Sequence, residues 1–287
     1  MDWQVDRRCD TVRQEHDVTG VRRSKHFLVA SDFDQTLSFN DSGIVLSEIL
    51  GVPGFAERVD GLARSHLVQQ GGELAYLIRH DPEFRGVRRE HLVEAGRRVR
   101  LKRGIPALVE FLGRGFDEAR FSFFVISAAP REIVEAALAP DVPPGHIHAT
   151  ELEYDDRTGE VRAVRCVPAG YGKVVVIEDL RRRLGVPPDR VIYIGDGSSD
   201  VHVMLHVNHR DGFTIAVSEH PQLTRIARST VLSESAFSVL VPILEQLFRR
   251  QPHEIRAVCE GHGLTLQDWD QSSTNRLVIS DIPEAVA

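Results

Sequence analysis

The chain has 287 residues, of which 42% are hydrophobic and 27% charged, and its formal net charge is −7. This composition is typical of a globular protein that is long enough for one large α/β domain, or for a core domain with a smaller cap. The acidic balance argues against nucleic acid as a partner, because such binding needs a basic surface. A membrane partner is not expected either, because no apolar run approaches the ~20 residues needed to span a bilayer.

Residues 1–24 are polar and lack apolar periodicity, so we expect a peripheral N-terminal arm and no secretory signal. The three cysteines, Cys9, Cys166 and Cys259, lie far apart and form no zinc or redox spacing. A disulfide framework is therefore not expected, and a reducing cytoplasm is the predicted location. The sequence does not predict the oligomeric state.

Short apolar runs recur along the chain and end in polar or glycine residues. They are rich in β-branched and aromatic side chains, which is typical of buried parallel strands. The runs are Phe27–Ala30, Phe121–Ile126, Val191–Ile194 and Phe213–Val217. Helical patterns lie among them at Pro130–Leu138, Lys173–Leu184 and Ala236–Phe248. This alternation predicts an α/β fold with a parallel sheet flanked by helices.

Two stretches depart from the alternation. Residues 42–102 contain only helix-like segments, at Ile44–Leu50, Phe55–Gln69, Glu73–His80 and Arg89–Val99, and predict a small helical cap inserted after the first strand. Thr150–Tyr154 and Glu160–Val164 flank a polar turn and predict a β-hairpin. No pattern is clear from Pro252 onward. We therefore expect a core domain made of residues 25–41 and 103–250, and a C-terminal extension over residues 251–287.

Two carboxylates follow the first predicted strand, in the sequence Asp32-Phe33-Asp34-Gln35-Thr36. Because side chains alternate at a strand end, Asp32 and Asp34 are expected to lie on the same side. One can attack phosphorus as a nucleophile while the other transfers a proton. Taken alone, the segment is equally well interpreted as a polar turn that caps a strand.

A glycine-rich loop, Gly195–Asp200, follows the third predicted strand. Its glycines allow a tight turn beside a ligand, and Asp196 and Asp200 offer the hard oxygen atoms that suit Mg²⁺. The alternative is a plain turn with an aspartate at a helix N-terminus. In parallel sheets ligands bind beyond the carboxyl ends of the strands, so this loop and Asp32 are expected to converge.

Two further residues have suitable positions. Ser127 ends the second predicted strand and enters a helix, where a hydroxyl group and backbone N–H groups can bind a phosphate. A helix-capping serine is the competing interpretation. Lys173 begins a predicted helix, and a lysine in such a place is more often simply solvated. Its position relative to the other motifs favours a functional role.

Together these motifs resemble those of the haloacid dehalogenase superfamily, in the branch of phosphoserine phosphatase. The matching residues are Asp32, Asp34 and Thr36 for the first motif, Ser127 for the second, Lys173 for the third, and Asp196 and Asp200 for the fourth. The resemblance covers residues 26–245 and implies the Rossmann-like core of that superfamily. It also implies that the helical insertion is a cap of the C1 type.

The resemblance implies a mechanism in which Asp32 is phosphorylated and Asp34 serves as general acid and then general base. Ser127 and Lys173 would neutralise charge on the transferred oxygens. Mg²⁺ would be held by the Asp32 carboxylate, the Asp34 backbone carbonyl and Asp196, with Asp200 as a further ligand or a support. The predicted activity is hydrolysis of a small phosphorylated metabolite. The alternatives are a phosphotransferase or mutase that uses the same intermediate, and a non-catalytic protein that binds a phosphometabolite.

Substrate selection is less well defined. In the phosphoserine branch a glutamate nine residues after the nucleophile binds the substrate amino group, and here that position is Asp41. An arginine of the cap, which holds the substrate carboxylate in that branch, corresponds to Arg79. Ala128 and Gly197, which adjoin the second and fourth motifs, are also expected to contact substrate. Ala128 replaces a glycine of the usual second motif, and Ser199 replaces an asparagine of the fourth, so phosphoserine is one of several possible substrates.

Two other groups of residues have a charge or a spacing that is found in binding sites. The basic run Arg97, Arg98, Arg100, Lys102 and Arg103 is best interpreted as a solvated helix end, with a grip on an anionic substrate as the alternative. His202 and His206 have a metal-site spacing on a helix but lack a third ligand nearby. They are predicted to be ordinary helix residues.

Overall fold

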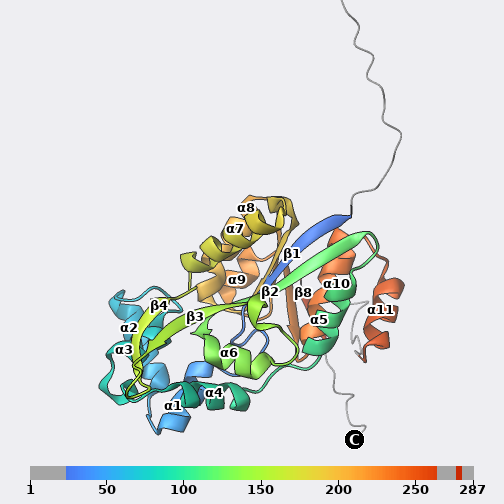
Figure 1. Ribbon diagram of the computed structural model, residues 1–287. Coiled ribbons are helices and arrows are strands. Elements are labelled where there is room, and N and C mark those ends of the chain that lie inside the picture. Colours follow the sequence, from blue (N-terminus) through green and yellow to red (C-terminus); the bar gives the residue numbers. More distant parts are fainter. Residues whose placement is uncertain (1–23, 264–275, 280–287) are drawn as a thin grey trace, which may run out of the picture.

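The computed structural model describes residues 24–263 and 276–279. Its centre is an eight-stranded sheet in the order β4-β3-β2-β1-β5-β6-β7-β8 (Figure 1). Neighbouring strands are parallel except for β3 and β4, which are antiparallel. The strands are β1 (Lys25–Ser31), β2 (Ala119–Pro130), β3 (Ile147–Tyr154), β4 (Val161–Cys166), β5 (Val191–Gly195), β6 (Phe213–Ala216), β7 (Ser229–Ser233) and β8 (Arg276–Ile279). The predicted α/β fold with a largely parallel sheet is confirmed.

The sheet separates two apolar layers, because alternate side chains of each strand face opposite sides. Leu28 and Ala30 of β1 contribute to the layer beneath helices α7 (Tyr171–Leu184), α8 (Val201–His209) and α9 (Pro221–Ile226). Phe27 and Val29 contribute to the other layer. That layer is covered by α5 (Ile105–Arg114), α6 (Arg131–Leu138), α10 (Leu240–Pro242) and α11 (Pro252–Gly261). Both faces of the sheet are therefore buried.

The insertion after β1 is helical, as predicted, and forms the cap. It contains α1 (Ser42–Leu50), α2 (Phe55–Ser65), α3 (Glu73–His80), the short 3-10 turn η1 (Pro82–Phe84) and α4 (Arg89–Arg98). Helix α4 packs closely on α6 of the core at Gly96, where an added Cβ would lie 2.3 Å from the carbonyl oxygen of Ile133. A glycine is needed at this crossing because any side chain would meet backbone atoms.

The predicted hairpin is also present. Strands β3 and β4 are joined by a turn in which the Asp155 carboxylate accepts hydrogen bonds from the backbone N–H groups of Arg157 and Thr158. The hairpin reaches the cap, because the N–H of Val161 donates to the carbonyl of Val87 at 3.1 Å. Figure 1 shows the hairpin beside α2 and α3. The edge of the sheet thus connects core and cap.

Other segments differ from the sequence-based expectation. The helix expected over residues 236–248 is divided into the 3-10 turn η5 (Ala236–Val239), α10 and the π-helical turn η6 (Ile243–Leu247). Pro242, which lacks a backbone N–H, lies at the junction. The tail without a recognised pattern forms α11 and β8, and β8 extends the sheet beside β7. The predicted arm lies almost wholly outside the described residues. Within the described ranges, no helix is long and apolar enough to cross a membrane.

Candidate active site

The predicted site residues gather at the carboxyl ends of the central strands. Asp32 follows β1, and its backbone N–H donates to the carbonyl of Ile194 in β5 at 2.9 Å, which joins the two strand ends. Phe33 turns away into the core and is fully buried. The Phe33 N–H donates to Asp32 Oδ1 at 2.7 Å. The alternation of polar and apolar residues in the first motif therefore places the Asp32 carboxylate in the site.

Lys173 links the first motif to the last. Its Nζ donates to Asp32 Oδ2 and to Asp200 Oδ1, each at 2.6 Å, and its side chain has no exposed surface. Burial lowers the pKa of Lys173, but the charges of Asp200 and Asp32 outweigh it, so the pKa lies above its ordinary value. For the Asp32 carboxylate, burial acts in the other direction and raises the pKa to about 6, although the ammonium of Lys173 opposes this shift. Lys173 is thus a buried cation between two carboxylates.

Asp200 organises the glycine-rich loop from within. Its Oδ1 also accepts a hydrogen bond from the hydroxyl of Tyr193 at 2.6 Å. Its Oδ2 accepts from the backbone N–H groups of Asp196 and Gly197, at 3.0 and 3.1 Å. Both oxygens therefore have partners within the protein, and the contacts fix the turn after β5.

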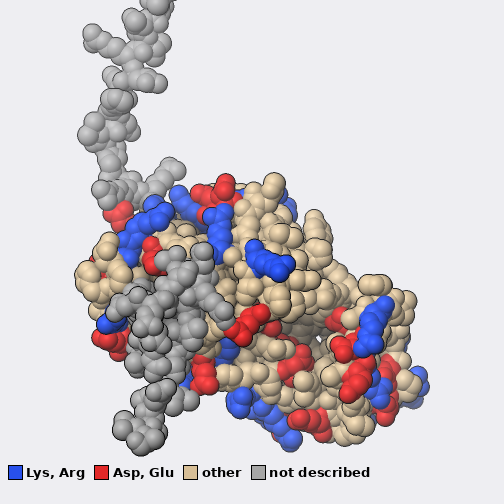
Figure 2. Space-filling model, turned by 180° about the vertical axis from the view of Figure 1, so that it is seen from behind, with Lys and Arg blue, Asp and Glu red and all other residues tan. Residues whose placement is uncertain are grey.

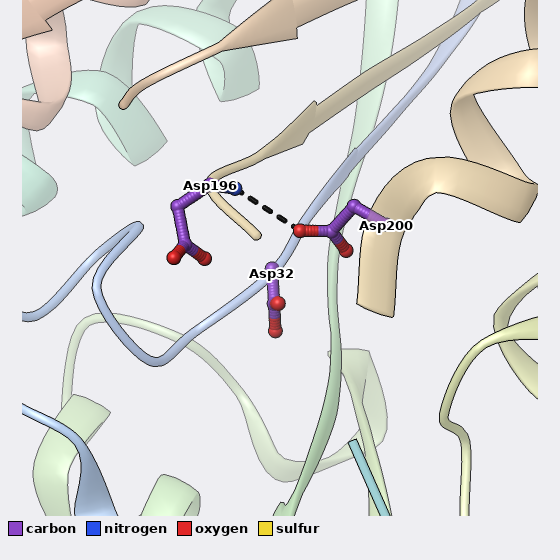
Figure 3. A group of neighbouring side chains, drawn as sticks. All are labelled: Asp32, Asp196 and Asp200. Carbon is purple, nitrogen blue, oxygen red and sulfur yellow. Dashed lines mark hydrogen bonds between the residues drawn. The ribbon is translucent and has the colours of Figure 1, made fainter. Parts of the chain in front are cut away.

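The carboxylates of Asp32 and Asp196 follow two strands that lie side by side, β1 and β5, and the carboxylate of Asp200 reaches them from the start of α8 (Figure 3). One oxygen atom of each lies within 4.8 Å of the others. Asp196 Oδ1 accepts a hydrogen bond from the Thr36 hydroxyl at 3.1 Å. Burial, followed by the charges of Asp32 and Asp200, raises the pKa of Asp196 well above its ordinary value. The excess of negative charge and the oxygen donors fit a divalent cation such as Mg²⁺.

Asp34 lies on the side of the site that faces the cap. Its two carboxylate oxygens accept hydrogen bonds from the N–H and the hydroxyl of Ser42, both at 2.8 Å, at the start of α1. Burial and then the charge of Asp41 raise the pKa of Asp34 well above its ordinary value. Asp41 caps α1, because its Oδ1 accepts from the N–H groups of Gly43 and Ile44 at 2.7 and 3.3 Å.

Ser127 is almost completely buried within β2. Its hydroxyl accepts a hydrogen bond from the N–H of Ala129 at 3.1 Å. Both residues lie within β2, and the helix that follows, α6, begins after Pro130 without a side-chain cap, so the helix-capping interpretation of Ser127 is wrong. The carbonyl of Ala128 accepts from the hydroxyl of Thr150 at 2.6 Å, which holds the strand end against β3. These contacts position the serine hydroxyl at the edge of the same site.

A pocket of about 310 Å³ lies between the strand ends and the cap. Its core side is lined by Asp32, Asp34, Ser127 and Asp196, and by seven other residues: Gln35, Asp41, Ala128, Ala129, Gly197, Ser198 and Ser199. Its cap side is lined by residues of α2, of α3 and of the loop between them: Phe55, Val59, Asp60, Ala63, Gln70, Gly71, Glu73 and Leu74. Lys173 and Asp200 lie beneath it. The structure therefore brings together the four motifs, Asp41, Ala128 and Gly197.

Arg79 is placed elsewhere. It is exposed in the last turn of α3 and lines a different pocket, with Tyr76, Arg162 and Val164. The basic run 97–103 does not line the 310 Å³ pocket either. His206, whose spacing from His202 is typical of a metal site, has its Nε2 3.0 Å from Glu178 Oε1. This contact agrees with the prediction that His206 is an ordinary helix residue.

Several residues of the site have no motif that reveals them. Tyr193 belongs to an apolar run, and its hydroxyl group is the one feature of the run that indicates a polar neighbour. Ser42 begins the cap and holds Asp34. Glu73 begins α3 and is 6% exposed, although an acidic residue at a helix start is usually solvated. The two glycines that precede Glu73 in the sequence mark the close approach of cap and core.

A family model described as haloacid dehalogenase-like hydrolase matches residues 29–205. No curated protein matches the sequence. A substrate-bound phosphoserine phosphatase complex has a TM-score of 0.60 at 18% identity, covering 75% of this chain and 97% of that chain. A phospho-aspartyl intermediate analogue of phosphoserine phosphatase has a TM-score of 0.57 at 19% identity, covering 75% and 98%. A phosphoserine phosphohydrolase-like protein from Francisella tularensis subsp. tularensis has a TM-score of 0.56 at 18% identity, covering 75% and 99%. At these identities the structures show a shared fold.

Proposed function

Because the chain belongs to the haloacid dehalogenase-like hydrolases, we propose that it is a Mg²⁺-dependent phosphatase that hydrolyses a small phosphomonoester. The observation that carries the proposal is the Asp32 carboxylate. It lies at a strand end, lines the pocket and is held by Lys173 and by the N–H of Phe33. A protein that only binds a phosphate has no need of a buried carboxylate at this place, because two anions repel each other.

In the proposed reaction an oxygen of Asp32 attacks phosphorus, and the bond from phosphorus to the leaving oxygen breaks. Asp34 gives its proton to that oxygen, so that an alcohol departs. Asp34 then takes a proton from a water molecule, whose oxygen attacks phosphorus. The bond between phosphorus and the Asp32 oxygen breaks, which releases inorganic phosphate and restores the Asp32 carboxylate. Ser127 and the ammonium of Lys173 stabilise negative charge on the site, which is the main source of catalysis in phosphoryl transfer.

Mg²⁺ would be held by Asp32, by Asp196 and by the backbone carbonyl of Asp34. Asp200 would support the loop, since both of its oxygens already accept hydrogen bonds. When bound, the cation would neutralise charge on the phosphoryl oxygens. The proposed place of action remains the cytoplasm.

The test is phosphate release from a general substrate such as p-nitrophenyl phosphate, with and without Mg²⁺. We expect Asp32→Asn to reduce kcat by at least about a thousandfold, because the nucleophile is lost. Asp189→Asn makes the same chemical change at an exposed position outside the pocket and should leave kcat unchanged. Circular dichroism checks that both variants fold. Undiminished release by Asp32→Asn, or activity that persists in EDTA, would contradict the proposal.

The phosphotransferase alternative shares every step up to the phosphorylated aspartate. It is distinguished by adding an acceptor alcohol and measuring phosphate release and the new phosphomonoester together. We expect free phosphate to remain the main product, because water is the proposed acceptor. Tight ligand binding without turnover in the presence of Mg²⁺ would instead favour the non-catalytic alternative.

A further inference from the structure

With phosphorus placed at Asp32, as the proposed function requires, the cap end of the pocket receives the leaving group. That end is formed by α2 and by the start of α3. Phe55, Val59 and Leu74 provide apolar surface there, and the other residues are short or polar. The available volume of about 310 Å³ must also accommodate the phosphoryl group, so the leaving group is small.

The charged side chains that line this pocket are all acidic among the residues that the structure describes: Asp32, Asp34, Asp41, Asp60, Glu73 and Asp196. Acidic side chains also border the hollow between core and cap in Figure 2. Asp32, Asp34 and Asp196 are used by the proposed chemistry. Asp60 is largely exposed and pairs with Arg64 at 3.8 Å. Asp41 caps α1.

Glu73 is the acidic residue that none of these roles explains. It is 6% exposed and lines the pocket. Within the described ranges, no ion pair joins it to a basic side chain. Burial and the nearby charge of Asp41 raise its pKa, while the N–H groups of Glu73 itself and of Gly71 oppose this shift. A buried carboxylate beside a second carboxylate is costly unless a cation accompanies it.

The residue expected to bind a substrate carboxylate is absent from the pocket. Arg79 is exposed and lines another pocket, beside Arg162. An acidic substituent on the leaving group would therefore face Asp41 and Glu73 without a positive partner. A positively charged substituent would meet these two carboxylates and the ring of Phe55, a combination that favours ammonium groups.

We propose that the substrate is a short aminoalkyl phosphate without a carboxylate, and that Glu73 binds the ammonium group of its leaving alcohol. Asp41 contributes negative charge next to Glu73, and Phe55 contacts the alkyl chain. Glu73 thereby determines specificity, and the phosphoryl end of the pocket performs the same chemistry on any phosphomonoester that fits.

Three phosphonates of similar size test this assignment. They are 2-aminoethylphosphonate, propylphosphonate and 2-carboxyethylphosphonate, whose arms are cationic, neutral and anionic. Their affinities are measured by calorimetry with Mg²⁺ on the full chain. We expect the amine to bind at least about tenfold more tightly than the propyl compound, since a hydrogen bond to a charged group is lost otherwise. The carboxyl compound should bind most weakly.

Glu73→Gln should remove most of the preference for the amine and leave the affinity for propylphosphonate within about twofold. Glu57→Gln is the matched control, because Glu57 is an exposed acidic residue of α2 that does not line the pocket. It should keep the preference of the wild type. An unchanged preference in Glu73→Gln would overturn the proposal, and so would equal affinity for the amine and the carboxyl compound in the wild-type chain.

The wild-type ranking is informative even if Glu73→Gln fails to fold. Phosphonates are not hydrolysed, so the ranking is also obtained whether or not the chain releases phosphate. A preference for the amine without turnover of any phosphomonoester contradicts the proposed function alone. Turnover of p-nitrophenyl phosphate without a preference for the amine contradicts the role of Glu73 alone.

Discussion

Lys173 carries a positive charge in a place where its side chain has no exposed surface. The charge is tolerated because Asp32 and Asp200 both accept hydrogen bonds from its Nζ. When one partner of such a buried pair is removed, the remaining charge typically costs about 3–5 kcal/mol. The position of the Asp32 carboxylate is therefore fixed by contacts whose loss is strongly destabilising, and this is what the proposed role as a nucleophile requires, because attack on phosphorus must come from one direction.

Glu178 lies further along α7, and its pKa is lowered, whereas the pKa of Lys173 is raised. It pairs with Arg181 of α7, with His206 of α8 and with Arg210, which directly follows α8. Hydrogen bonds from Arg181 and then from His206 lower the pKa of Glu178 from 4.5 to about 2. A carboxylate with a lowered folded pKa stabilises the fold above its unfolded pKa, and this contribution is lost as pH falls toward the folded pKa.

We expect Glu178→Gln to lower the free energy of unfolding by about 1–2 kcal/mol at pH 7, with allowance for screening of partly exposed pairs. The difference from the wild type should shrink as pH falls from about 4.5 toward 2, because the wild-type carboxylate then becomes protonated. Urea unfolding at pH 7, 4 and 3 measures it. Glu48→Gln, at an exposed position of α1, is the control. A difference that grows on acidification would contradict the assigned direction.

The types of the proposed reacting residues could be predicted from the sequence because each lies near the end of an apolar run or near the start of a helix. Asp32, Ser127 and Asp196 occur at points where an apolar run stops, and such points meet at one edge of a parallel sheet. Their supporting partners could not be predicted. The bond from Tyr193 to Asp200 and the bonds from Ser42 to Asp34 depend on the packing of separate elements, and neither Tyr193 nor Ser42 stands out within its own segment.

At the scale of elements, two glycines inside cap helices have opposite surroundings. An added Cβ at Gly96 of α4 would lie 2.3 Å from the Ile133 carbonyl oxygen and 2.8 Å from the Cβ of Ala136. An added Cβ at Gly61 of α2 would meet nothing within 4 Å. Both glycines weaken an isolated helix relative to alanine, so only their tertiary contacts distinguish them.

We expect Gly96→Ala to lower the free energy of unfolding by about 1–3 kcal/mol, because α4 must move away from α6. Gly61→Ala should raise it by about 0.5–1 kcal/mol, because alanine favours the helix and has room. Guanidinium unfolding of the two variants and the wild type measures both changes. If the two substitutions had the same sign, the close crossing of α4 and α6 would be refuted.

Elements were predictable where local chemistry and tertiary structure agree. The turn at Asp155 favours a hairpin by its own side-chain contacts, and the hairpin is present. The interrupted helix after β7 was not predicted, since its apolar spacing suits a helix while Pro242 removes a hydrogen bond within it. Strand β8 is short and takes its place from pairing with β7, which lies far away in the sequence.

At the scale of the whole molecule, the cap is closed over the core. Besides the crossing of α4 and α6, the loop before α3 approaches the glycine-rich loop, since an added Cβ at Gly71 would lie 2.9 Å from the Cβ of Ser199. Both residues line the pocket, so this contact lies at its border on the side of the fourth motif. Gly71 also has a φ of +90°, which side chains rarely adopt.

Gly71→Ala should therefore lower kcat/KM for p-nitrophenyl phosphate by about tenfold, because a small displacement of the cap disturbs the alignment of the site. Gly51→Ala is the matched control. Its φ is +68°, but an added Cβ there would meet nothing within 4 Å. Both variants should lose about 1 kcal/mol of stability from backbone strain. Equal kcat/KM values in the two variants would show that the contact with Ser199 does not govern closure.

The β3–β4 hairpin has a further consequence for behaviour at high protein concentration. Strand β4 ends the sheet, and an unprotected edge strand can recruit the edge of another molecule and start aggregation. Here Val161 is already bonded to the cap, and Arg162 and Arg165 both pair with Glu153 of β3. The cap and these arginines thus make the strand a poor template for a second chain, so the hairpin protects the solubility of the molecule as well as joining its two parts.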